Sequence, residues 1–147
     1  MSRQIIAIGG GGFGRNPGQG IIEKYILDQA LKSNPHICFI PTATGDDLTY
    51  KESYYSTFTK LKCTPTHLDF FKRTPNLKQL IEKQDIIFVG GGNTKSMLAV
   101  WRDWGLDVIL KDAYEAGIIM CGVLSLIHIS EPTRLRRISY AVFCVKK

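Results

Sequence analysis

The sequence has few cysteines and no long apolar run. Four cysteines in 147 residues form neither a Cys-x-x-Cys pair nor a cluster at metal-ligand spacing, which argues against a disulfide scaffold and a zinc site. No apolar run approaches the roughly 18 residues that a membrane span needs, and the apolar run before Gly9 has only four residues, too few for a signal-peptide core. We therefore expect a soluble, cytoplasmic protein with reduced thiols, no membrane partner, no metal and no cofactor. The cysteines are Cys38, Cys63, Cys121 and Cys144.

Glycine is absent from residues 123–147, although the chain contains 14 glycines up to Gly122. The charge changes at the same place. Residues 1–122 carry 14 Lys and Arg against 12 Asp and Glu, whereas residues 123–147 carry five against one. The net charge of +6 therefore comes mainly from the last 25 residues. Because basic residues indicate a polyanionic partner only where they gather on a folded surface, we expect no nucleic-acid partner.

An apolar content of 44% with 22% charge fits one globular domain. Apolar runs that end in glycine or polar turns predict strands at 5–8, 36–41, 65–71, 85–89 and 118–121. Helical spacing of apolar residues predicts helices at 21–32, 48–61, 76–83 and 106–116, and a further helix that follows Thr94, carries Met97, Leu98 and Trp101, and is ended by Gly105. Strands that alternate with helices predict an α/β fold, a three-layer sandwich with a mostly parallel sheet.

Three polar or glycine-rich loops follow predicted strands, at residues 9–20, 41–47 and 90–94. In parallel α/β sheets such loops gather outside the carboxyl ends of the strands and form the ligand site. The first loop fits the dinucleotide pattern Gly-x-Gly-x-x-Gly, but its helix begins only near Ile21 and the second strand ends in Pro41 rather than an acid. A glycine loop that allows chain reversal is the favoured interpretation, and a nucleotide site is the alternative.

The loop at residues 90–94 is the more specific signal. Three glycines after a buried strand allow backbone N–H groups to face a ligand, and the helix that follows adds a positive partial charge suited to an oxyanion or a carboxylate. Asn93 or Thr94 can also cap that helix, and the two roles are compatible. The candidate oxyanion or substrate-binding residues are Gly91, Gly92, Asn93 and Thr94.

The strand at 118–121 leads through Gly122 and Val123 toward what has the form of a nucleophile elbow, a sharp turn that exposes a serine or cysteine between small residues. The next residues are Leu124, Ser125 and Leu126, which lack the small side chains that such a turn needs. Cys121 fits better as an interior strand residue than as a nucleophile.

Residues 5–13, 37–46, 63–68 and 85–94, continued by 97–101 and 104–107, resemble the peptidase E (dipeptidase E) family of serine peptidases. The resemblance covers Arg3 to about Val123. It implies a glutamine-amidotransferase-like (flavodoxin-like) fold and hydrolysis of short peptides, with a preference for N-terminal aspartate in the best-known branch. It also implies a serine nucleophile in a Gly-hydrophobic-Ser-Ala-Gly elbow, a histidine base and an acidic residue further along, and an oxyanion N–H from Gly92.

A gap-free alignment with that elbow places Leu124 at the nucleophile position. Ser125 lies one residue later, and a slip of one residue along a strand turns the side chain to the opposite face. Ser125 is therefore kept only as a displaced catalytic candidate. Residues 124–147 bear no resemblance to the family and are similar to translated adaptor read-through, so that His128 would be accidental. We expect residues 1–123 to be the N-terminal part of a peptidase E-like domain, cut after its fifth strand, and the chain to be inactive as written.

A different class of function stays open as the alternative. The glycine-rich loops could form a non-catalytic module that binds an anionic metabolite or a nucleotide. On either interpretation, a sheet that lacks its later strands exposes an apolar edge, so we expect association into a homo-oligomer or aggregation.

Overall fold

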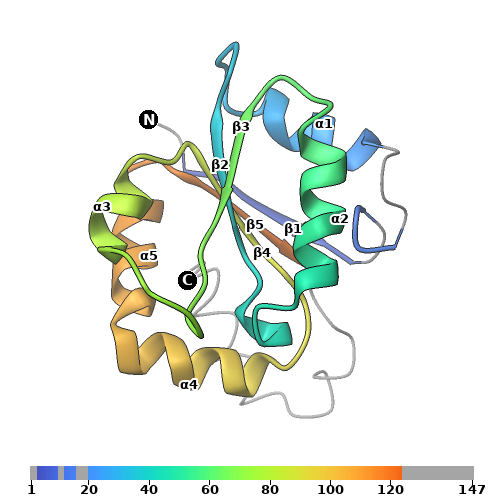
Figure 1. Cartoon of the computed structure of the whole chain (residues 1–147). Helices are drawn as coiled ribbons and strands as arrows, with labels where there is room; N and C mark the ends of the chain where they lie inside the picture. Colours follow the sequence, from blue (N-terminus) through green and yellow to red (C-terminus); the bar gives the residue numbers. More distant parts are fainter. Residues whose placement is uncertain (1–2, 10–11, 16–19, 124–147) are drawn as a thin grey trace.

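The computed structural model describes residues 3–9, 12–15 and 20–123 of the chain. Within them, five strands form one sheet in the order β1-β5-β4-β2-β3, and every neighbouring pair is parallel. All carboxyl ends of the strands therefore lie at one edge of the sheet, as the sequence predicts (Figure 1). The strands are β1 (Ile5–Ile8), β2 (His36–Ile40), β3 (Thr64–His67), β4 (Ile86–Val89) and β5 (Ile119–Val123).

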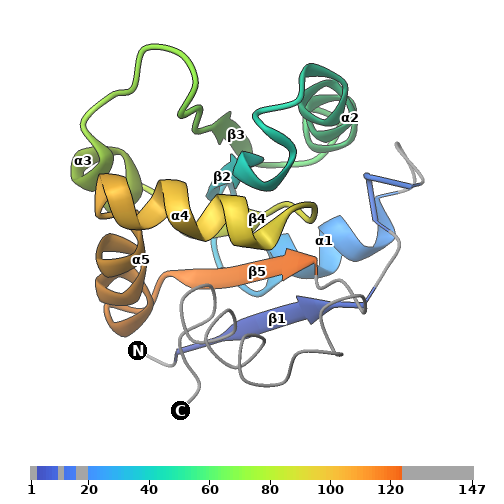
Figure 2. The same ribbon diagram turned by 90° about the horizontal axis from the view of Figure 1, so that it is seen from below.

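Helices cover both faces of the sheet, which confirms the predicted three layers (Figures 1 and 2). One face carries α1 (Ile21–Asp28) and α2 (Leu48–Phe58); the other carries α3 (Leu77–Glu82), α4 (Thr94–Trp104) and α5 (Leu106–Glu115). A short 3-10 helix, η1 (Thr42–Thr44), follows β2. Because side chains alternate along a strand, Cys38 packs into the α3–α5 core, and the next residue, Phe39, packs into the α1–α2 core.

The third strand ends at His67, so it is shorter than the predicted 65–71. One carboxylate oxygen of Asp46 accepts hydrogen bonds from the backbone N–H groups of Phe70, at 2.6 Å, and Phe71, at 2.9 Å. These two donors are therefore directed to the loop after β2 instead of to a neighbouring strand. A side chain far away in the sequence ends the strand, so the local apolar pattern could not indicate it.

Asp85 joins the amino-terminal ends of two central strands. Its carboxylate accepts from the Lys32 ammonium at 2.6 Å and from the His36 backbone N–H at 2.8 Å. Partial burial disfavours the charged carboxylate, but the hydrogen bonds from Lys32 and His36 outweigh that effect and hold the pKa of Asp85 below its ordinary value.

Replacement of Asp85 by asparagine is expected to weaken the dependence of stability on acid. A carboxyl group whose pKa is lower in the folded than in the unfolded chain stabilises the fold above its unfolded pKa, and this contribution is lost as the pH falls through the folded pKa. The free energy of unfolding, measured by urea titration from about pH 7 to about pH 3, should fall more steeply in the wild type than in Asp85→Asn. The exposed Asp112→Asn is the matched control. Equal acid dependence of the two variants would contradict this role of Asp85.

Candidate functional site

The structure brings the loop after β4 against the loop after β2, at the carboxyl edge of the sheet. The Asn93 backbone N–H donates to the Ala43 carbonyl oxygen at 2.8 Å. Gly92 has φ +146°, and a Cβ atom there would lie only 2.5 Å from the same oxygen. Glycine is therefore required at this position, both for its conformation and for the close approach of the two backbones.

The amino terminus of α4 lies directly behind these glycines. The Asn93 side chain accepts a hydrogen bond from the Ser96 N–H at 3.0 Å and caps the helix, which is one of the two roles predicted for residues 93 and 94. Gly92 itself is exposed. The backbone at Gly92 is thus open to solvent beside the positive end of the α4 dipole, where a ligand that carries negative charge is favoured.

Tyr50, on α2, connects two of the glycine-rich loops and was missed by sequence reasoning. Its hydroxyl oxygen accepts from the Gly91 N–H at 3.3 Å. A Cβ atom at Gly90 would lie 2.8 Å from the Tyr50 ring, and one at Gly14 would lie 3.2 Å from it. Burial raises the pKa of Tyr50, so the phenol stays protonated at neutral pH. The N–H of Gly91 therefore has a partner within the fold, unlike the role predicted for it toward a ligand.

The β2 loop and α4 are joined a second time below the site. The Trp101 indole N–H donates to the Thr42 hydroxyl oxygen at 3.1 Å, and Trp101 is fully buried. This bond ties the middle of α4 to η1, while the bond from Asn93 to Ala43 ties the start of the same helix to the same turn. Loop 90–94 is thus held by the body of α4 as well as by its own backbone.

The end of β5 approaches the same loop. A Cβ atom on Gly91 would lie 3.4 Å from a methyl carbon of Val123, the last residue of the strand. Cys121 is buried, and burial raises the pKa of its thiol well above the ordinary value, which agrees with an interior residue rather than a nucleophile. Leu124 and the displaced candidate Ser125 lie outside the described residues.

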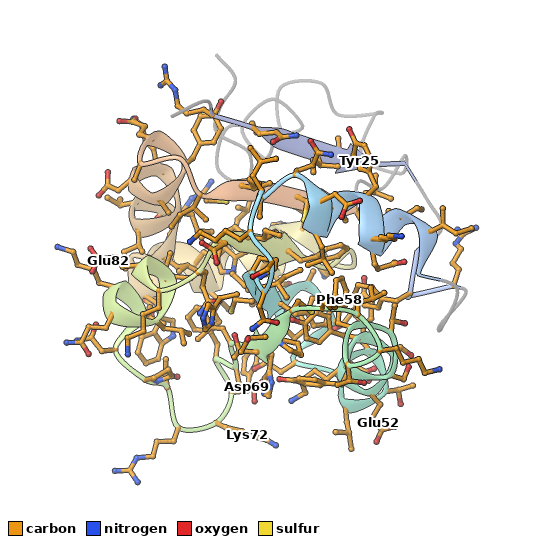
Figure 3. All side chains as sticks on the ribbon, turned by 90° about the horizontal axis from the view of Figure 1, so that it is seen from above. Tyr25, Glu52, Phe58, Asp69, Lys72 and Glu82 are labelled. Carbon is orange, nitrogen blue, oxygen red and sulfur yellow. The ribbon has the colours of Figure 1, made fainter. Side chains whose placement is uncertain are left out.

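A chain of polar side chains links α2 to the end of β3. The Tyr55 hydroxyl lies 2.6 Å from His67 Nδ1, His67 Nε2 lies 3.3 Å from Asp69 Oδ2, and the buried Lys51 ammonium lies 3.0 Å from Asp69 Oδ1. Burial raises the pKa of Tyr55 to about 12, so its phenol is a poor nucleophile near pH 7. We interpret this series of polar contacts as structural, because it helps hold α2 in place. Phe58 of α2 points toward the sheet, and Glu52 of α2 points away from it (Figure 3).

Within residues 3–9, 12–15 and 20–123, no three His, Cys, Asp or Glu side chains could hold a metal ion between them. Of the helices in that same part of the chain, none has the length and apolar character to cross a membrane.

Residues 5–124 match the family model described as peptidase family S51. Over 122 residues the chain is 43% identical to "Uncharacterized peptidase YgaJ" of Bacillus subtilis (strain 168). This match covers 82% of this chain and 53% of that protein. A solved structure of a putative peptidase E protein from Listeria monocytogenes EGD-e matches with a TM-score of 0.60 and 21% identity, over 83% of this chain and 59% of that one. A peptidase from an acI-B1 actinobacterium matches with a TM-score of 0.61 and 18% identity, over 81% and 52%.

The two solved structures are too distant in sequence to show more than a shared fold. The chain also spans only slightly more than half the length of each of these three relatives. What the whole relatives do therefore does not transfer directly to the 147-residue chain.

Proposed function

This chain belongs to peptidase family S51, and from that membership we propose that its described residues form the oxyanion-binding part of a serine peptidase site. The substrates we propose are short peptides, including dipeptides with an N-terminal aspartate, and the compartment is the cytoplasm. Family membership favours this function over the non-catalytic module that binds an anionic metabolite or a nucleotide.

The exposed backbone of Gly92 is the observation that carries the proposal. Attack on a peptide carbonyl places negative charge on its oxygen, and an oxyanion site needs preorganised N–H donors aimed at that oxygen. Gly92 stands at the amino terminus of α4, in a conformation fixed by the close approach of Ala43. Because the Gly91 N–H donates to Tyr50, Gly92 is the donor we assign to the oxyanion. Asn93 and Thr94 then begin the helix whose dipole supports it.

The remaining catalytic groups would come from beyond β5. In the mechanism that we propose, a serine oxygen attacks the carbonyl carbon while a histidine takes the serine proton, and a second N–H comes from the residue after the serine. In this chain the nucleophile position falls on Leu124, and leucine has no nucleophilic atom. Ser125 is the displaced candidate. The family match ends at residue 124, where glycine disappears and the charge changes, which supports our proposal that residues 124–147 do not belong to the peptidase domain.

We therefore expect no hydrolysis of Asp-Xaa dipeptides by the 147-residue chain. A chimera that joins residues 1–123 to the part of the Bacillus subtilis protein that aligns from residue 124 onward should hydrolyse them. The chimera regains the elbow and keeps the Gly92 donor. Keeping that donor matters because loss of a single oxyanion donor typically lowers kcat by about 10²- to 10³-fold. Release of free aspartate, followed by amino-acid analysis, measures the reaction.

Two further proteins complete this experiment. The chimera with alanine at the elbow serine is the control for contaminating peptidases. Ser125→Ala in the 147-residue chain tests the displaced candidate. Turnover by the unmodified chain at the rate of the chimera would contradict the proposal that the chain is inactive, and an inactive chimera that is nevertheless folded would contradict the proposed peptidase function.

A further inference from the structure

We propose that the hydroxyl group of Tyr50 binds substrate in this site, by donating a hydrogen bond to a carboxylate oxygen of the peptide. This role rests on the proposed peptidase function, since it concerns how the same site recognises its substrate. Tyr50 is then a determinant of specificity, while the oxyanion stays with Gly92. Binding of peptides measures the role directly, so it can be tested separately from hydrolysis.

The Tyr50 side chain stands between two glycine-rich loops at the carboxyl edge of the sheet. Tyr50 is the third residue of α2, and Figure 1 shows this end of α2 beside the segment that follows β4. A Cβ atom at Gly14 would lie 3.2 Å from one edge of the ring and 3.6 Å from the hydroxyl oxygen. A Cβ atom at Gly90 would lie 2.8 Å from the opposite edge. The missing side chains at these two glycines therefore leave the space that the ring occupies.

Aromatic packing fixes the ring in this place. Its centroid lies 4.9 Å from that of Phe39 and 5.5 Å from that of Phe13, and both phenylalanines are buried. The contact with Phe39 is edge to face, one of the arrangements that aromatic pairs prefer. Because the ring is held on several sides, its hydroxyl group loses little conformational freedom when a ligand binds.

The hydroxyl group of Tyr50 has a proton available for a ligand. Its oxygen accepts from the Gly91 N–H at 3.3 Å, and burial raises the pKa of the phenol, so the proton is retained at neutral pH. Within residues 3–9, 12–15 and 20–123, no group accepts this proton. Hydrogen bonds in series polarise one another, so the bond from Gly91 makes the phenol a stronger donor. Tyr50 is only partly buried and Gly14 is exposed, which leaves the hydroxyl group accessible.

The surroundings of this hydroxyl group favour a ligand with negative charge. Gly91, which donates to it, is followed by the exposed Gly92 at the amino terminus of α4, where the helix dipole favours an anion. Gly91 also approaches Val123, after which the nucleophile position follows. A hydrogen bond to an ionised acceptor is roughly twice as strong as one to a neutral acceptor. We therefore assign the proton of Tyr50 to a carboxylate close to the scissile bond. In a dipeptide this is either the side chain of an N-terminal aspartate or the C-terminal carboxylate.

Calorimetric titration of the 147-residue chain with four dipeptides tests this assignment. Asp-Ala has both carboxylates, Asp-Ala amide has only that of the side chain, Asn-Ala has only that of the C-terminus, and Asn-Ala amide has neither. Tyr50→Phe should weaken binding roughly tenfold or more for the dipeptides that carry the recognised carboxylate, and leave Asn-Ala amide unchanged. A loss with Asp-Ala amide assigns the aspartate side chain, and a loss with Asn-Ala assigns the C-terminal carboxylate.

Two further variants complete the titration. Tyr25→Phe makes the same change at a side chain that is 56% exposed on α1, and it should bind all four dipeptides as the wild type does. Gly14→Ala places a methyl group beside the Tyr50 hydroxyl group without changing it. This variant should weaken binding of the same dipeptides severalfold, and it keeps the test decisive if Tyr50→Phe fails to fold.

Equal weakening of all four dipeptides by Tyr50→Phe would assign Tyr50 a purely structural role and overturn the proposal. Absence of binding by the wild-type chain would overturn it as well. Carboxylate-dependent binding through Tyr50, together with a folded chimera that hydrolyses nothing, would support this role and contradict only the peptidase function. An active chimera, with binding that Tyr50→Phe leaves unchanged, would contradict only the role of Tyr50.

Discussion

Replacement of Gly92 by alanine is expected to lower the free energy of unfolding by about 3 kcal/mol. The added Cβ atom would lie 2.5 Å from the Ala43 oxygen and 2.8 Å from the Ala43 carbonyl carbon, and neither belongs to a flexible side chain that could move aside. The backbone φ of +146° is in addition a conformation that L-residues rarely adopt. Loop 90–94 must therefore move away from η1, and the hydrogen bond from Asn93 to Ala43 should be lost.

Thermal unfolding followed by circular dichroism measures this effect, and we expect a midpoint roughly 10 °C lower than in the wild type. Gly45→Ala is the matched control: Gly45 also has a positive φ, of +69°, but nothing lies within 4 Å of its Cβ position. That variant should lose only the free energy that an L-residue costs in the left-handed backbone conformation, on the order of 1 kcal/mol. The difference between the two variants isolates the close approach at Gly92. Equal destabilisation would show that the contact between the two loops contributes little.

Removal of the Trp101 side chain is the second change with a large expected effect. Trp101→Ala should cost about 3 to 5 kcal/mol, because it leaves a cavity in the α3–α5 core and removes the hydrogen bond to Thr42. Trp104, three residues later on the same helix, is 48% exposed and contacts the ring of Phe70. Trp104→Ala should therefore cost much less. Urea unfolding of both variants measures the comparison.

Trp101→Phe separates the two contributions of this residue. Phenylalanine keeps most of the apolar volume but has no N–H to donate, so the buried Thr42 hydroxyl loses its indole partner at a cost of about 1 to 3 kcal/mol. A Trp104→Ala variant as unstable as Trp101→Ala would contradict the assignment of Trp101 as the side chain that fixes α4 to η1.

The strands and most helices could be predicted from local patterns, because each is a short apolar or amphipathic segment with a glycine or polar turn at its end. Ile86–Val89 is the clearest case: its four residues are apolar, and all are buried. The order β1-β5-β4-β2-β3 could not be predicted in the same way. It depends on which strands pair across the sheet, and alternation of strands with helices fixes only that the pairs are parallel.

The candidate site was predictable only where one segment determines it. The Asn93 cap lies within one loop, and the residues of that loop indicate it directly. The oxyanion role of Gly92 follows from the family resemblance and stays a prediction. Tyr50 was missed because its role depends on the approach of Gly14 and Gly90, 36 and 40 residues away in the sequence. The length of β3 was wrong for the same reason, since Asp46 takes the N–H groups that would have extended the strand. Sequence patterns could not show these tertiary contacts.

The position of Gly92 relative to a bound transition-state analogue is the most direct test of the site proposed here. The chimera that carries the second half of the Bacillus subtilis protein can be crystallised with a peptide aldehyde, which would form a tetrahedral adduct with the serine that we propose at its elbow. Our assignment predicts the adduct oxygen about 2.7 to 3.1 Å from the Gly92 nitrogen, with the Gly91 N–H still donating to Tyr50. An adduct oxygen beyond hydrogen-bond reach of Gly92, held by other donors, would contradict it.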